Sequence, residues 1–282
     1  MAAILNESLV DGPIPRAEVP GWREKYGVVA GITRKPYDLG LWTNTAVEEV
    51  MKRWREFRRS EPGFSQYVLG HQVHGARVEL HARQDGARGR RGADRSGGRR
   101  SSDKIVLVDQ GEEWRIFEGV DGHATGSAGT MLCVTVADCT PVYLLHPKTK
   151  TVALLHAGWR GTAAGILERG VQTLLVAAQG IPEDGGPENI VCHLGVSICG
   201  ECYEVGSEVF EAMGRFASSQ KPAAARAKGM LDVRAVLAAQ AKALGIKEIT
   251  VSGHCSKHGE GWYSARNGEG GRMVAYSGVP TG

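Results

Sequence analysis

The sequence of 282 residues lacks any long hydrophobic run. No apolar stretch reaches the roughly 18 residues that a membrane-spanning helix needs. The amino terminus does not combine a basic start with the apolar segment of about 7 to 15 residues that marks a secretory signal. We therefore predict neither secretion nor insertion into a membrane, and we expect a cytoplasmic protein.

The glycine-rich loops that bind nucleotide phosphates are also missing. Neither GxGxxG nor GxxxxGK[ST] occurs, which disfavours ordinary dinucleotide or P-loop binding. Cysteine is sparse and scattered, with six residues in a long chain without a secretory signal, so reduced thiols are expected rather than a disulfide framework. Cys133 and Cys192 fall in apolar strands and are predicted to be core residues.

Positive charge is concentrated in one segment. The formal net charge is +3, but residues 81–104 hold seven Arg and one Lys against three Asp, a local charge of +5, which leaves about −2 for the remainder. The Arg- and Gly-rich insert at 83–102 has no apolar periodicity and is typical of a disordered loop. It lacks interleaved aromatic residues and a folded basic face, so a solvated loop is favoured over nucleic-acid binding.

Short apolar strands alternate with amphipathic helices along the rest of the chain, which predicts an α+β fold, a single domain of mixed β-sheets flanked by helices. Residues 1–25 are Pro-rich and are expected to be an irregular segment, followed by one domain over 26–278. The expected strands lie at 26–32, 66–73, 77–81, 105–109, 114–117, 131–136, 142–146, 151–156, 190–194 and 249–252. Expected helices follow a capping box at Thr45 and Glu48, follow Gly161, span 207–217, and begin at an Asp232 cap.

A β-hairpin is predicted in the stretch ADCTPVYLLHPKTKTVALLHAGWRG. The strands 142–146 and 151–156 flank a turn-like PKTK break, so that Pro141 would oppose His156. Cys139 would then lie about two residues along the ladder from His156, roughly 5 to 8 Å away. The helix expected after Gly161 would present free N–H groups beside Arg160, a combination suited to phosphate.

Two kinds of chemistry are open to Cys139 and His156. They are suited to act as a nucleophilic pair, or to bind a metal with His74 as a third protein ligand. Asp138 would orient Cys139, act as a general acid or base, or cap a turn. Cys199 and Cys202 form a CxxC, but no second CxxC follows, so we interpret them as loop thiols rather than as a zinc ribbon.

Four motifs together resemble the laccase-domain family, first called multicopper polyphenol oxidase and later assigned as a zinc-dependent purine nucleoside phosphorylase with adenosine deaminase activity. The motifs are QVHG (72–75), ADCTPV (137–142), HAGWRGT (156–162) and SICGECYEVG (197–206). The resemblance implies that His74, Cys139 and His156 bind zinc, with Asp138 and Arg160 as catalytic groups beside them. It also implies that purine nucleosides and phosphate are the partners, with Arg34, Arg266 and Arg272 adding charge for substrate.

The sequence departs from the family pattern on the substrate side. The usual TRxGG loop is TRKP here, and Glu201 stands where the first of two adjacent cysteines is common. Near the C-terminus the pattern CT…FFSYRRD…TGR is only partly kept, at Cys255, Ser256, 262–267, Gly271 and Arg272. The motifs that carry the metal ligands are therefore kept, whereas the residues on the substrate side vary.

Three alternative functions stay open. A copper-dependent polyphenol oxidase would need several His-rich sites, whereas this chain has nine His and no HxH pair. A Cys/His hydrolase using Cys139 and His156 would survive metal removal. A binding module with a structural metal would normally need a fourth protein ligand. The oligomeric state is not determined by the sequence.

Overall fold

A computed structural model describes residues 2–81, 104–109, 112–178, 185–221 and 228–282. The Arg- and Gly-rich insert predicted at 83–102 lies outside the described residues. In the part of the chain that the structure describes, no helix is both long enough and apolar enough to cross a membrane.

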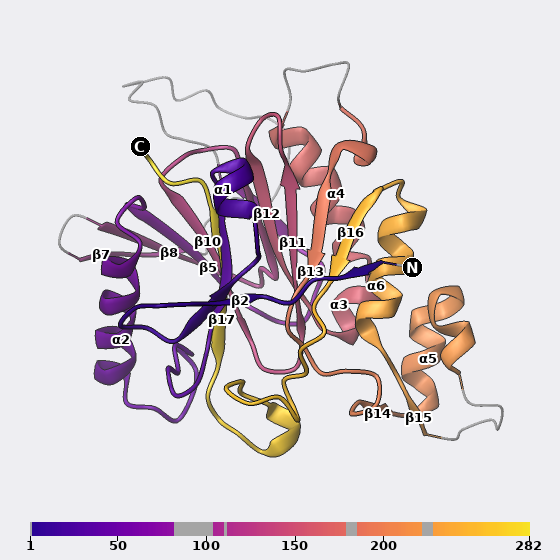
Figure 1. The fold of residues 1–282 in the computed structure, drawn as a ribbon. Coiled ribbons are helices and arrows are strands. Elements are labelled where there is room, and N and C mark those ends of the chain that lie inside the picture. The colour runs from indigo at the N-terminus through magenta and orange to yellow at the C-terminus, as the bar shows by residue number, and fades with distance from the viewer. Residues whose placement is uncertain (1, 82–103, 110–111, 179–184, 222–227) are drawn as a thin grey trace, which may run out of the picture.

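Most strands of the described chain belong to two sheets of mixed direction (Figure 1). The order in the seven-stranded sheet is β1 (Ala3–Ile4), β16 (Glu248–Val251), β13 (Val191–Leu194), β11 (Thr140–His146), β12 (Thr151–Ala157), β9 (Gly122–Thr125), β6 (Val78–His81). The order in the eight-stranded sheet is β2 (Ser8–Val10), β3 (Arg16–Glu18), β4 (Val29–Thr33), β17 (Met273–Gly278), β10 (Thr130–Val136), β5 (Gln66–His71), β8 (Glu112–Glu118), β7 (Lys104–Asp109). A small ribbon joins β14 (Glu204–Val205) to β15 (Gly229–Met230).

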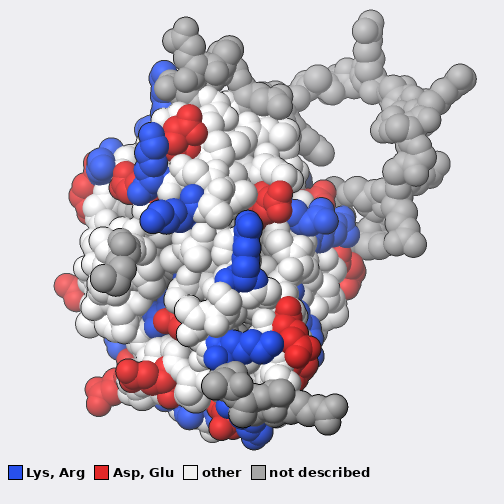
Figure 2. Space-filling model, turned by 90° about the vertical axis from the view of Figure 1, so that its right-hand side faces the viewer, with Lys and Arg blue, Asp and Glu red and all other residues white. Residues whose placement is uncertain are grey.

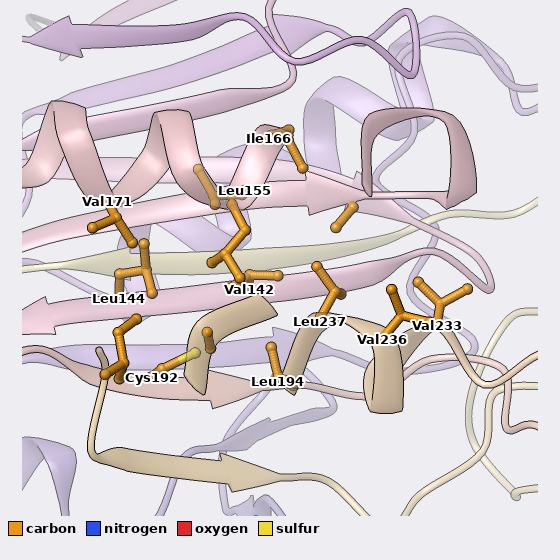
Figure 3. Close-up of a cluster of buried hydrophobic side chains, with 14 of the residues drawn as sticks. Val142, Leu144, Leu155, Ile166, Val171, Cys192, Leu194, Val233, Val236 and Leu237 are labelled. Atoms are coloured by element: carbon orange, nitrogen blue, oxygen red, sulfur yellow. The ribbon is translucent and has the colours of Figure 1, made fainter. Parts of the chain in front are cut away.

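The two sheets pack face to face, and helices cover their outer faces. Apolar side chains of β4, β10 and β17 meet those of β11 and β12 between the sheets. The outer face of the seven-stranded sheet packs against α4 (Ile166–Ala177), α5 (Ser207–Met213) and α6 (Val233–Ala243). Figure 3 shows Val142, Leu144 and Leu155 of this sheet among side chains of α4 and α6. The eight-stranded sheet packs against α2 (Val47–Ser60). The predicted α+β fold, a single domain of mixed sheets flanked by helices, is confirmed.

The start of α2 differs from the predicted capping box. Its N-cap is Ala46, without a side-chain cap, and the Thr45 hydroxyl instead donates a hydrogen bond to Asp38 Oδ2 at 2.7 Å. The buried Asp38 carboxylate also accepts from the Gly40 and Arg272 backbone N–H groups, so Thr45 serves the preceding loop rather than the helix. The predicted Asp232 cap of α6 is confirmed, since its carboxylate accepts from Ala235 N at 3.0 Å.

The expectation of an irregular segment at 1–25 is wrong. This segment contains β1, β2, β3 and most of α1 (Trp22–Tyr26), and it crosses from one sheet to the other (Figure 1). Strands of two or three residues are too short to show a period-two pattern, and they form because neighbouring strands offer unpaired backbone groups. Glu7, between β1 and β2, is buried, and its carboxylate accepts from the Ser252 hydroxyl and Val196 N–H and contacts His193 Nε2.

Glu7→Ala is expected to lower the free energy of unfolding by about 3 kcal/mol, because buried donors at Val196 and Ser252 lose their acceptor. Urea unfolding measures the loss. Glu24→Ala, an exposed acidic residue on α1, is the matched control and should change stability by less than about 0.5 kcal/mol. Equal stability of the two variants would contradict the prediction.

The same carboxylate contributes to the acid sensitivity of the fold. Burial alone would raise the pKa of Glu7, but His193, Ser252 and the backbone outweigh burial and hold that pKa below 4.5. A carboxyl whose pKa is lower in the folded state stabilises the protein above its unfolded value and loses that contribution as pH falls. The contribution of Glu7 is therefore fully present above the ordinary pKa of a glutamate and is lost progressively as the pH falls through the lower pKa of the folded state.

Charge is mixed on the outer surface of the helical layer. Figure 2 shows the face on the right-hand side of Figure 1, where Lys and Arg are interspersed with Asp and Glu. Neither sign of charge dominates the described part of this face.

Candidate metal centre

The predicted hairpin is confirmed in its register. β11 and β12 pair antiparallel, with His146 opposite Thr151 and Pro141 opposite His156. Both strands are buried along their whole length, because one face packs on the other sheet and one on the helices. The pairing brings Cys139, just before β11, next to His156 on β12.

His74 joins these two residues from the loop after β5. The donor atoms of His74, Cys139 and His156 all lie within 4.8 Å of one another, and the two imidazole rings are 4.8 Å apart between centroids. Zinc bonds of about 2.0 to 2.3 Å place N and S donors roughly 3.5 to 4 Å apart, so small side-chain adjustments would close this group around an ion. Three protein donors leave a coordination position open.

A carboxylate that our sequence analysis did not single out holds this site together. Asp121 is completely buried before β9, and its carboxylate accepts from the backbone N–H groups of Val73 (3.2 Å), His74 (2.9 Å) and Gly75 (2.8 Å). Its Oδ1 also lies 2.9 Å from His156 Nδ1. A carboxylate only accepts, so Nδ1 of His156 carries the proton and Nε2 is available as a ligand atom.

Strained backbone surrounds the three ligands. Three non-glycine residues of the described chain have positive φ, and two of them are His74 (59°) and Asp138 (85°). Such angles are uncommon for residues other than glycine and persist where surrounding contacts hold them. The backbone of Gly158 packs closely against two of the ligands. A Cβ at this position would lie 2.9 Å from Cys139 Sγ and 3.1 Å from His74 Cδ2, so a side chain there would crowd both residues.

Electrostatics favour the charged forms of Cys139 and His156. Burial alone would raise the pKa of the Cys139 thiol, but the imidazoles of His156 and His74 lower that pKa to about 6. Burial would lower the pKa of His156, but the Cys139 thiolate and the Asp121 carboxylate raise it to about 9. Without a metal these shifts favour a thiolate beside a protonated imidazole, and a metal that binds Nε2 of His156 would displace the proton from that nitrogen. The thiolate is the form that binds a metal and the form that attacks as a nucleophile.

The ligands lie in a cavity of about 280 Å³. Trp42, His71 and Arg272 also line it, and the rings of Trp42 and His71 stack with centroids 4.6 Å apart. Gln72 fixes the loop that carries His74, because its side chain bonds the backbone N–H and C=O of Thr135 on β10. The cavity thus combines the candidate metal centre, an aromatic surface and the guanidinium of Arg272.

Asp138 lies between the metal centre and the C-terminal loops. Its Oδ1 accepts from the Ser256 hydroxyl at 2.7 Å, and its Oδ2 accepts from Arg266 N at 2.8 Å. Both carboxylate oxygens therefore accept hydrogen bonds from the C-terminal loops, and these bonds fix the position of the residue just before Cys139. This arrangement fits an orienting role, and proton transfer by Asp138 stays a prediction.

Of the four predicted arginines, only Arg272 is among the residues lining this cavity. The guanidinium of Arg34 packs on the Trp262 ring beside a separate cavity, and that of Arg266 packs on Tyr203. Arg160 is exposed and packs on Trp159.

Arg160 lies in α3 (Trp159–Ala163), a short helix that Gly165, with φ of 82°, separates from α4. The single helix expected after Gly161 is therefore two helices.

Comparison with known proteins identifies relatives along the whole chain. A sequence model of the family described as "Multi-copper polyphenol oxidoreductase laccase" matches residues 24–279. The purine nucleoside phosphorylase YlmD of Bacillus subtilis is 27% identical over 274 residues, 93% of this chain and 88% of that protein. The YlmD crystal structure from Geobacillus stearothermophilus superposes with a TM-score of 0.75 at 25% identity, covering 98% of this chain and 100% of that one.

Of two further relatives, one is also named a purine nucleoside phosphorylase and the other is named an adenosine deaminase. A purine nucleoside phosphorylase of Deinococcus radiodurans is 32% identical over 166 residues, and adenosine deaminase RL5 of an unknown prokaryotic organism is 34% identical over 161 residues. These matches cover 58% and 55% of this chain, and the chain spans about three fifths of each relative, 62% and 59%. The family match over residues 24–279 and the YlmD fold agree: this chain belongs to the multi-copper polyphenol oxidoreductase laccase family.

Proposed function

We propose that the protein is a zinc-dependent purine nucleoside phosphorylase whose metal ligands are His74, Cys139 and His156. The observation that carries the proposal is the placement of these three donors in the cavity that Trp42 and Arg272 also line. A set of one Cys and two His suits zinc, and three protein ligands are typical of a catalytic rather than a structural zinc. The names of the relatives support a nucleoside and phosphate as substrates.

In phosphorolysis a phosphate oxygen forms a bond to C1′ of the ribose while the bond from C1′ to the purine nitrogen breaks. The proton that phosphate gives up on forming the new bond protonates the leaving purine, and ribose 1-phosphate remains. When bound, zinc supplies a Lewis acid that polarises oxygen atoms and lowers the pKa of water toward about 7. The stacked Trp42 and His71 rings offer a flat surface for the base, and Arg272 supplies positive charge for the anion. Roles of Arg34, Arg160 and Arg266 in substrate binding stay predictions.

Hydrolytic deamination of adenosine to inosine is the second candidate. It is supported by the similarity to adenosine deaminase RL5 and by the same donor set, which suits activation of water. Oxidation of phenols by copper has less support, because the described residues gather metal donors in two separate groups rather than in a set of His-rich sites.

Chromatography of inosine and adenosine incubated with the protein, with and without phosphate, tests the proposal. We expect release of hypoxanthine from inosine only when phosphate is present, loss of that activity after chelation, and its return with zinc. Full activity in metal-free protein would favour the Cys139–His156 hydrolase instead. Activity restored by copper alone and directed at phenols would favour the oxidase.

Trp42→Ala is expected to raise KM for inosine about tenfold with a smaller change in kcat, because stacking of a base on an aromatic ring contributes roughly 1 to 3 kcal/mol. Trp42 is 52% exposed, so its removal should leave the fold intact. Steady-state kinetics of Trp42→Ala and of the control Trp42→Phe, which keeps a ring, measure the effect. An unchanged KM in Trp42→Ala would place the base elsewhere.

A further inference from the structure

A second group of metal donors lies outside the cavity, on two loops far apart in the sequence. Cys199 and Cys202 follow β13, and Cys255 and His258 follow β16, with all four donor atoms within 4.8 Å of one another. His258 Nδ1 is 3.3 Å from Cys202 Sγ and 3.9 Å from Cys199 Sγ. None of these four residues belongs to the proposed catalytic centre.

We propose that Cys199, Cys202, Cys255 and His258 form a second, structural zinc site. Four protein donors of the Cys₃His type complete a tetrahedral shell without water, as structural zinc sites require. A zinc ion with Zn–S bonds of about 2.3 Å holds its donors roughly 3.8 Å apart, a separation within the range of the distances observed here. The two pairs have the spacings CxxC and CxxH, each of which lets one turn present two donors to the same point.

The backbone of both turns is already arranged for an ion. Cys202 N–H donates to Cys199 O at 3.0 Å, and Gly259 N–H donates to Cys255 O at 2.8 Å. Cys199 N–H donates to Cys255 Sγ at 3.4 Å, the type of hydrogen bond that stabilises the negative charge of a metal-bound thiolate. A disulfide among these cysteines would leave one thiol over and would give the neighbouring imidazole of His258 no role.

The ion would support the loops that reach the catalytic centre. Ser256, beside Cys255, donates to Asp138 Oδ1, and Ile198 N–H, beside Cys199, donates to Asp138 O at 3.0 Å. Ser197 and Cys255 also form a parallel bridge. Asp138 precedes the ligand Cys139, so the second zinc would join the two loops that hold Asp138 in its left-handed conformation.

Metal content of the purified full-length protein, measured by mass spectrometry against protein concentration, tests this site. We expect two zinc ions per chain, falling to one in Cys202→Ser and in His258→Ala, with a lower melting temperature in both. His258→Cys supplies another zinc ligand and should keep two ions. Glu201→Ala, an exposed residue in the same turn that donates no ligand, is the matched control and should also keep two.

The two proposed sites fail independently in this experiment. His74→Ala removes the other ion, so combining it with His258→Ala should leave no zinc, whether or not any nucleoside is consumed. A wild-type protein that holds a single zinc per chain, with the same content in Cys202→Ser and His258→Ala, would overturn the second site. So would a disulfide between two of its cysteines in protein purified under non-reducing conditions.

Discussion

His156→Ala is expected to remove the metal of the catalytic centre and to lower kcat/KM for phosphorolysis by about 10³-fold or more. The variant loses one of three protein ligands, and the remaining pair of His74 and Cys139 also loses the charge that lowers the pKa of the thiol. Lewis-acid stabilisation of a developing charge contributes several kcal/mol, and about 4 kcal/mol corresponds to a 10³-fold change in rate. Metal analysis and initial rates with inosine and phosphate measure the two effects.

His146→Asn is the matched control for that substitution. His146 lies at the other end of the same hairpin, where its Nδ1 contacts the Thr149 hydroxyl at 2.8 Å, a contact that an asparagine can also make. The control should retain the metal and the activity even if its stability falls. A His156→Ala protein that is free of metal at this centre and still cleaves inosine would refute the proposed role of the ion.

Local pairing explains why the hairpin was predictable. Its two strands are adjacent in the sequence, and their β-branched and apolar residues flank a short turn, so the register follows from the turn alone. Cys139 and His156 could therefore be placed together from the residues themselves. His74 comes from a distant loop: zinc chemistry offered it as a third ligand and the family resemblance assigned it, because no local pattern connects it to the hairpin.

The residues that escaped prediction depend on contacts between distant segments. Asp121 faces His156 from 35 positions away and bonds a loop 46 to 48 positions before it. Its DGH sequence indicates only a turn. The second metal group was missed because we sought another CxxC, whereas the partner of Cys199 and Cys202 is the CxxH at Cys255 and His258. That spacing is the pattern that could have revealed it.

Long cationic side chains were the least predictable part of the site. A motif places the backbone of an arginine, but four rotatable bonds decide where the guanidinium lies. Arg34, Arg160 and Arg266 each pack on an aromatic ring, at 4.8, 4.4 and 4.6 Å from the ring centroid. Arg272 alone of the predicted four lines the cavity.

Asp121→Asn is expected to weaken zinc binding at the catalytic centre by about 10- to 100-fold, the usual cost of removing a group that orients a metal ligand. The Asp121 carboxylate accepts from three backbone N–H groups and from His156 Nδ1. Asparagine keeps the shape but replaces one acceptor oxygen with an amide donor, which then faces other donors. The imidazole of His156 would lose the partner that fixes its tautomer.

Competition with a chromophoric chelator measures the affinity, and urea unfolding measures a stability loss of about 3 kcal/mol expected from the unpaired buried donors. Asp11→Asn, an exposed carboxylate on the N-terminal segment, controls for the change of charge and should leave both quantities unchanged. Wild-type zinc affinity in Asp121→Asn would show that the loop geometry alone orients His74 and His156. A loss of affinity without a loss of stability would instead assign the carboxylate to the metal centre rather than to the fold, because the unpaired donors would then have found other partners.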